Sequence, residues 1–313
     1  MAVAWQLANR ASVADLNAFI QAIFPIRLGD VPFLYHIPYS RSFDAANFFV
    51  SSIVLSITPT AGFYASLHSG TKIGFLHRPF NLDRREVPRL STILANHKGF
   101  DEVLTVGNNV ALAGRLGLDP RDAHIVQGYK GDPDRCIGLV GALRQHTQAA
   151  EVKSRVLHEF CGHFEGCFGF GDEDSAGEDE PSCDDDVLHA IAIMNAFHPE
   201  EVDRVLEISQ QNGLLANKTD AKGLLYVTGA VREPGLRYSR ERGIKVICVG
   251  HRVCEEWGIR HMAERLRERF PGLRVDEIYD EEEPREQLRR GKTGEQKVVD
   301  NTGNTGGLPV AAE

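Results

Sequence analysis

The stretch that decides the fold is KVICVGHRVCEEWGIRHMAERL, at residues 245–266. Its apolar beginning at 245–249 predicts a buried strand, Gly250 predicts a turn, and the residues after it have the spacing of a helix. His251 and Glu255 are four residues apart, which places them about 40° from each other around that helix. The same face continues as an apolar stripe, formed by Ile259, Met262, Leu266 and Phe270. The face that is expected to enter the core therefore begins with an imidazole and a carboxylate.

These two polar groups need a partner if their helix face is buried. Removing an imidazole and a carboxylate from water without a partner would cost several kcal/mol, and a bound cation would offset that cost. The position at the carboxyl end of a strand is also where open α/β sheets bind ligands. The alternative is a frayed helix start with both side chains in water. The local pattern alone does not choose between the two.

Two earlier segments end in similar side chains. The apolar strand expected at 72–76 delivers His77 at its carboxyl end, and Pro79 closes that strand. Asp101 follows in the segment HKGFD at residues 97–101. Each residue also has an ordinary interpretation, His77 as a strand-end histidine and Asp101 as a turn or cap residue.

Hydrophobic spacing predicts the remaining elements. Strands are expected at residues 48–57, 72–76, 123–127, 137–140, 224–228 and 245–249. Helices are expected at residues 12–24, 109–116, 186–195, 199–211 and 251–270. Ser12 and Asp15 have the spacing of a capping box for the first of these helices. The alternation of strands and helices predicts an α/β architecture with a largely parallel sheet.

One main domain is expected over residues 1–280. Within it, about 160–186 is rich in glycine and acid and is typical of a surface insertion. Residues 171–186 hold nine acidic groups and no Lys or Arg, which equals the formal net charge of −9 for the whole chain. Polar residues and glycines dominate 281–313, so that segment is expected to be a disordered tail.

Composition excludes several classes of protein. The chain has no run of about 18 apolar residues, so we expect no membrane span. Outside the acidic segment its charges are balanced without a concentrated basic patch, so we expect no direct binding of nucleic acid. The N-terminus lacks a secretory signal pattern, and six cysteines are sparse for 313 residues, which favours reduced thiols. We therefore expect a cytoplasmic protein, with the nucleus as the alternative location.

A second combination of metal-ligand types occurs at Cys161, His163 and Cys167, which could hold zinc. His158 and Glu159 match the first two residues of the H-E-x-x-H zinc motif. His163, however, follows His158 by five residues, which is about 140° around a helix, so the motif is excluded.

Taken together, four motifs resemble those of the NIF-three-like family, also known as GTP cyclohydrolase type-two homologues. They are HRP at 77–79, HKGFD at 97–101, LGL at 116–118 and GHRVCE at 250–255. The family's counterparts are HHP, HTNLD, LGL and GHxxTE, in the same order along the chain. The resemblance covers roughly residues 10–275 and implies a two-lobed α/β/α fold with a metal site at the carboxyl ends of strands.

The resemblance implies that His77, Asp101, His251 and Glu255 are metal ligands. Two imidazoles and two carboxylates suit Zn, Fe or Mn. The family holds two metals, but Arg78 stands where the family has its second histidine, and Arg cannot coordinate a cation. We therefore expect one tightly held metal per chain and a weaker second one or none.

The resemblance also bears on activity and assembly. A metal-dependent hydrolase that acts on a nucleotide-like or phosphorylated small molecule is the first hypothesis. Arg78 would then hold an anionic group, or else form a surface salt bridge, and His97 would carry a proton or support the ligands. The alternative is a non-catalytic, metal-dependent regulatory protein that acts through a protein partner such as a transcriptional co-regulator. The family further implies a ring-shaped homo-oligomer, of which a hexamer is one form.

Overall fold

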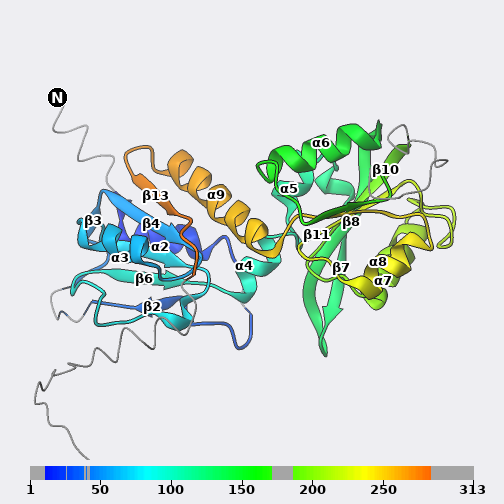
Figure 1. Cartoon of the computed structure of the whole chain (residues 1–313). Coiled ribbons are helices and arrows are strands. Elements are labelled where there is room, and N and C mark those ends of the chain that lie inside the picture. The colour runs from blue at the N-terminus through cyan, green and yellow to red at the C-terminus, as the bar shows by residue number, and fades with distance from the viewer. Residues whose placement is uncertain (1–10, 26, 39, 41–42, 171–185, 283–313) are drawn as a thin grey trace, which may run out of the picture. The chain divides into compact units, whose positions relative to one another are not determined.

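Two β-sheets organise the computed structural model, which describes residues 11–170, apart from 26, 39, 41 and 42, and residues 186–282 (Figure 1). The chain divides into two units, one that ends at Asp280 and one that begins at Glu281. The acidic segment at 171–185 and the tail at 283–313, for which an insertion and disorder were predicted, lie outside the described residues. The predicted α/β class is confirmed.

The first sheet has five strands in the order β13-β4-β5-β6-β2. These are β13 (Arg274–Ile278), β4 (Ser52–Ser56), β5 (Ile73–Leu76), β6 (Thr92–Ala95) and β2 (Leu34–His36). The first four run parallel, and β2 is antiparallel at the edge. Every residue of β4, β5 and β6 is buried, as expected for parallel strands covered on both faces.

Short elements surround this sheet. They are β1 (Ala11–Ser12), which pairs with β3 (Phe49–Val50), the helices α2 (Val13–Gln21), α3 (Ala61–His68) and α4 (Lys98–Val103), and the 3-10 helix η1 (Pro79–Asn81). The predicted capping box of α2 is confirmed, because Ser12 Oγ accepts a hydrogen bond from the Asp15 backbone N–H at 3.0 Å and the Asp15 carboxylate accepts one from the Ser12 N–H at 3.2 Å.

The second sheet has six strands in the order β7-β8-β10-β11-β12-β9. These are β7 (His124–Tyr129), β8 (Asp132–Gln148), β10 (Val187–Met194), β11 (Leu224–Thr228), β12 (Lys245–Cys248) and β9 (Gly166–Phe168). Only β10, β11 and β12 run parallel to one another, so the sheet is mixed and not largely parallel as predicted.

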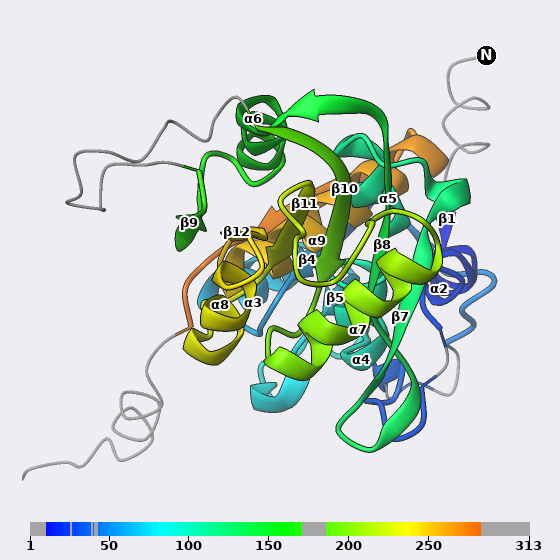
Figure 2. The same cartoon turned by 90° about the vertical axis from the view of Figure 1, so that its right-hand side faces the viewer.

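Helices cover both faces of the second sheet. One face packs against α5 (Val110–Arg115) and α6 (Ala149–Glu159), and the other against α7 (Pro199–Gln211) and α8 (Glu233–Arg240). Neighbouring residues on a strand divide between these two cores: Leu225 lies on the α6 side and Tyr226 on the α7 side. Figure 2 shows α7 and α8 in front of the strands. A second 3-10 helix, η2 (Pro120–Asp122), precedes β7.

One prediction about the middle of the chain was wrong. Residues 186–195, predicted as a helix, contain the strand β10, whose residues Ala190 to Met194 are all buried. A strand buried on both faces is apolar throughout and has no period of two that would reveal it. The insertion predicted at about 160–186 stays a prediction. Its described part has exposed residues at 161–165, the edge strand β9, which pairs with β12, and the buried Phe170.

The helix α9 (His251–Arg269) belongs to both hydrophobic cores. Cys254 and Trp257 in its first half pack in the core of the second sheet, whereas Met262 and Leu266 pack in that of the first. Gly258 lies between the two halves, and a Cβ atom there would be 2.7 Å from the Leu104 carbonyl oxygen. Figure 1 shows α9 running from the second sheet to the first.

No helix in the described part of the chain is both long and apolar enough to cross a membrane.

Candidate metal centre

His77 lies directly after β5 and is completely buried. Its ring stacks on Phe100, with the centroids 4.2 Å apart. Its Nδ1 atom is 3.2 Å from the carbonyl oxygen of Asn96. Because a carbonyl oxygen only accepts hydrogen bonds, Nδ1 carries a proton. The other ring nitrogen, Nε2, is then the atom available to a ligand.

Two carboxylates face this nitrogen. Nε2 of His77 is 3.3 Å from Asp101 Oδ1 and 3.2 Å from Glu255 Oε1. Glu255 is also buried, and its Oε1 lies 3.3 Å from Nε2 of His251, one turn earlier on α9. The structure therefore brings together all four residues that were predicted as ligands, from the end of β5, from α4 and from the start of α9.

The buried atoms at the centre of this group lack hydrogen bonds of normal geometry. His77 Nε2 and Glu255 Oε1 have no hydrogen-bond partner among the described residues, although the two atoms lie close enough for an ion pair. A neutral His77 would point a lone pair at two negative charges. Either a proton on Nε2 or a cation among these atoms resolves that conflict, so the side chains present fit a divalent metal ion.

The pKa values of the groups around His77 Nε2 show that this place favours positive charge. Burial lowers the pKa of His77, but the neighbouring Asp101 and Glu255 outweigh it and raise that pKa to about 9. Burial raises the pKa of Glu255, but His251 and His77 outweigh it and lower that pKa well below its ordinary value. Glu255 in turn raises the pKa of His251. The carboxylate of Glu255 is therefore ionised and attracts positive charge, either on the neighbouring imidazoles or on a metal ion.

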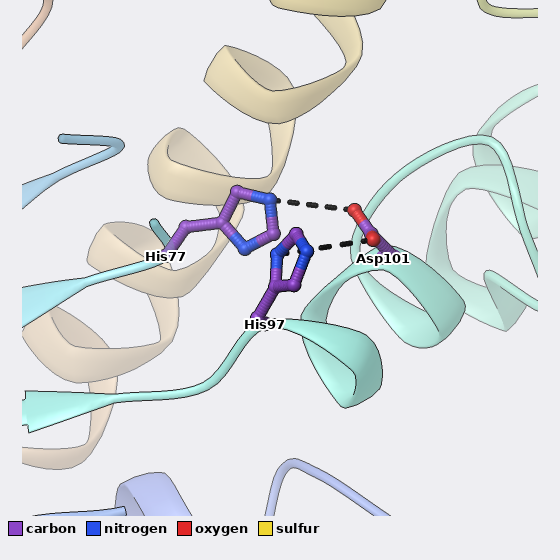
Figure 3. Close-up of side chains that lie close together, drawn as sticks. All are labelled: His77, His97 and Asp101. Carbon is purple, nitrogen blue, oxygen red and sulfur yellow. Dashed lines mark ion pairs between the residues drawn. The ribbon is translucent and has the colours of Figure 1, made fainter. Parts of the chain in front are cut away.

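His97 is a further ligand candidate, which the sequence suggested only as a proton carrier or as a support for the ligands. Its Nδ1 is 4.0 Å from Asp101 Oδ2, and its ring centroid is 5.0 Å from that of His77 (Figure 3). Each of these three side chains offers a ligand atom within 4.8 Å of the other two, so they could hold a metal ion. Burial lowers the pKa of His97, which favours the neutral imidazole that metals bind.

Two residues that were not predicted from the sequence hold α4 in place. Both carboxylate oxygens of Asp30 accept hydrogen bonds from backbone N–H groups at the start of α4, those of His97, Lys98 and Gly99 at 3.0–3.1 Å. Asn96 accepts one from the Phe100 N–H through its side chain and orients His77 through its carbonyl oxygen. Asn96 could have been found as a cap residue before a helix, but Asp30 lies 67 residues from His97.

A cavity of about 420 Å³ adjoins the site. Its wall includes His97, Asp101, His251, Glu255 and Arg78, whereas His77 is completely buried and does not line it. The positive charge of Arg78 reaches His97 and His251. The charge of Arg78 lowers the pKa of His97, in the same direction as burial. It also lowers the pKa of His251, against the increase that Glu255 causes. Arg78 therefore lies within electrostatic reach of the site and exposes part of its side chain to the cavity.

The cysteine group does not form a site. Cys161 Sγ lies 3.1 Å from the guanidinium of Arg260, which would repel a cation. Among the residues that the structure describes, His77, His97 and Asp101 are the one group of three or more such side chains whose ligand atoms all lie within 4.8 Å of one another. Glu255 and His251 join this group through pairwise contacts, from Glu255 Oε1 to His77 Nε2 and to His251 Nε2.

Comparison with known proteins gives the chain its relatives. A GTP cyclohydrolase 1 type 2 homolog from Pseudomonas aeruginosa is 29% identical over 183 residues, which is 57% of this chain and 58% of that protein. The match thus spans less than two thirds of the curated relative. No protein-family model matches the chain.

Solved structures share its fold. A Bacillus cereus protein related to NIF3 superposes with a TM-score of 0.55 at 13% identity, covering 88% of this chain and 99% of that one. The chain has the NIF3-like fold. Reduced HcgD from Methanocaldococcus jannaschii shares the NIF3-like fold with a TM-score of 0.54 at 15% identity, covering 86% and 98% of the two chains. The resemblance expected from the four motifs is confirmed.

Proposed function

We propose that this NIF3-like chain is a metal-dependent hydrolase that acts on a nucleotide-like or phosphorylated small molecule. The observation that supports it most is the buried Nε2 of His77, which faces the carboxylates of Asp101 and Glu255 at 3.2–3.3 Å. His77, Asp101, His251 and Glu255 would hold one divalent ion, with Zn, Fe and Mn as the candidates. When bound, such an ion polarises a substrate oxygen and acidifies water.

The chain's own residues would do the rest. His97 has a depressed pKa and lies beside Asp101 on the cavity wall, so near neutrality it is a base that can accept a proton. Arg78 carries a permanent positive charge next to the ligands and would orient an anionic group of the substrate. A non-catalytic, regulatory protein would need no space for a substrate beside the metal ligands. The cavity of about 420 Å³ therefore favours an enzyme.

Metal analysis combined with a screen of nucleotides and phosphomonoesters tests this function. We expect about one ion per chain, and Glu255→Gln should lower metal affinity at least about tenfold and abolish hydrolysis, since it removes a charge shared by two histidines. Glu256→Gln is the matched control, because Glu256 pairs with Arg252 and not with the site. A parent protein that takes up no metal when supplied with Zn, Fe or Mn would overturn the proposal.

The homo-oligomer, the protein partner and the cytoplasmic location stay predictions. Light scattering on the purified protein is the measurement for the first of these, and a monomer at micromolar concentration would contradict it.

A further inference from the structure

A second part of the same cavity is lined by cations that come from other segments of the chain. Lys130 and Arg135 belong to the hairpin of β7 and β8, and Arg232 precedes α8. No carboxylate of the described residues lies within 4.0 Å of any of these three side chains. Their charges are therefore available to a ligand, whereas Glu102 neutralises Arg27, for example.

The hairpin holds Lys130 in an uncommon conformation. Two residues, Lys130 and Gly131, connect Tyr129 and Asp132, which pair with each other across the hairpin. Lys130 has a φ of 49° and Gly131 one of 82°. Asn, Asp or Gly usually occupies the first of two such positions, because a longer side chain is strained there. A strained residue at the edge of a cavity is a reason to look for function.

Two of the cations lie near the ring of Tyr129, which does not neutralise them. Lys130 Nζ is 5.0 Å from the centroid of its ring, and Arg135 Cζ is 5.3 Å from the same centroid. An aromatic face attracts a cation but adds no net negative charge. The ring thus attracts two positive charges that line the cavity, and it leaves both able to bind an anion.

We propose that Lys130, Arg135 and Arg232 form a subsite for a phosphoryl group of the bound molecule, distinct from the group that would react beside His77. Three cations, two of them guanidinium groups, suit a phosphate dianion, which accepts paired hydrogen bonds from Arg. The cavity volume of about 420 Å³ fits a small molecule and not a macromolecule. The identity of this group as part of a substrate rests on the proposed function, but the binding of phosphate does not.

Calorimetric titration of inorganic pyrophosphate into the full-length, chelator-treated protein tests the subsite. Lys130→Gly is the decisive variant, since glycine adopts a positive φ without strain. We expect it to weaken pyrophosphate binding about tenfold or more while its unfolding temperature stays the same or rises. Arg135→Gln should weaken binding similarly. Arg144→Gln is the matched control on the same strand, because Arg144 is exposed and does not line the cavity, and its affinity should match that of the parent.

Two results would overturn the subsite: parental affinity in both Lys130→Gly and Arg135→Gln, or a loss of binding confined to Arg78→Gln. The experiment separates the subsite from the hydrolase because no metal is present. If the protein binds pyrophosphate but never takes up metal, the subsite stands and the proposed function is wrong. If it takes up metal but does not bind pyrophosphate, the subsite is wrong and the proposed function stands.

Discussion

The two ring nitrogens of His77 have opposite surroundings. One donates a hydrogen bond to the Asn96 carbonyl oxygen, and the other faces Asp101 and Glu255. A backbone carbonyl that holds one nitrogen fixes both the tautomer and the direction of the ring, as in metal-binding histidines generally. The ring is also packed against Phe100, so its orientation does not depend on a bound ion.

Arg78, the residue after His77, leads to a prediction about metal content. Arg78→His should raise the metal content from about one ion per chain toward two, because it exchanges a fixed cation for a ligand. Two unit charges about 4 Å apart interact by about 4 kcal/mol at an effective dielectric constant of about 20, and a divalent ion doubles that repulsion. Elemental analysis after dialysis measures the change.

Arg84→His provides the control for this exchange. Arg84 is an exposed arginine that lies over Tyr35 and does not line the cavity, so its replacement should leave the metal content as it is. Two full-occupancy ions in the unmodified protein would show that Arg78 does not exclude the second ion.

The four candidate ligands were predicted from the family resemblance, because the local pattern left the role of each residue open. His77 directly follows the strand β5, whereas Asp101 lies in α4 and His251 and Glu255 lie in α9. Asp30 could not be predicted in the same way, because its role depends on a loop that meets the start of α4 from far along the chain. The hairpin around Lys130 was also missed, since a lysine and a glycine between strands indicate only a turn.

Among the elements, α9 makes a close backbone contact with the segment that follows α4. Gly258 sits where α9 passes Phe100 and the carbonyl of Leu104, and a Cβ atom there would approach them to 2.6 and 2.7 Å. A backbone carbonyl cannot move aside as a flexible side chain can. The glycine therefore sets the distance between α9 and the segment that carries Asp101.

Gly258→Ala should consequently lower the free energy of unfolding by about 1–3 kcal/mol, even though alanine is the better helix former. Gly114→Ala in α5 is the matched control. Its added Cβ would meet only a Pro120 side-chain atom at 3.6 Å, and we expect a gain of about 0.4–1 kcal/mol. Urea denaturation of both variants measures the difference, and equal effects of the same sign would contradict this view of the contact.

The helix α7 was predicted well and the strand β10 was not. The helix α7 has buried residues such as Val202 and Leu206 on one side and charged residues on the other, and its predicted limits of 199–211 are confirmed. The strand β10 is apolar and buried from Ala190 to Met194, so only its partners β8 and β11 reveal that it is a strand. Such long-range pairing is absent from any local pattern.

In the molecule as a whole, the chain passes from one sheet to the other twice. It leaves the first sheet after β6 through α4, builds the whole second sheet, and returns through α9 to add β13 beside β4. Asp101 lies at the first passage, and His251 and Glu255 lie at the second. The candidate ligands thus stand at both places where the two sheets are covalently connected.

A metal ion held by these residues would act as a reversible cross-link. It would close a loop of about 150 residues, whose closure a disulfide of similar span would stabilise by about 5 kcal/mol in the chain-entropy treatment. An ion that binds only the native state at a thousandfold excess over its dissociation constant stabilises it by about 4 kcal/mol. Chelation should therefore lower the unfolding temperature of the parent protein by more than that of Glu255→Gln, as differential scanning calorimetry would show. An equal decrease in both would mean that the ion binds elsewhere. With the ion bound, the two sheets could not move apart without first breaking bonds to the metal. The concentration of available metal would then determine the lifetime of their packed arrangement.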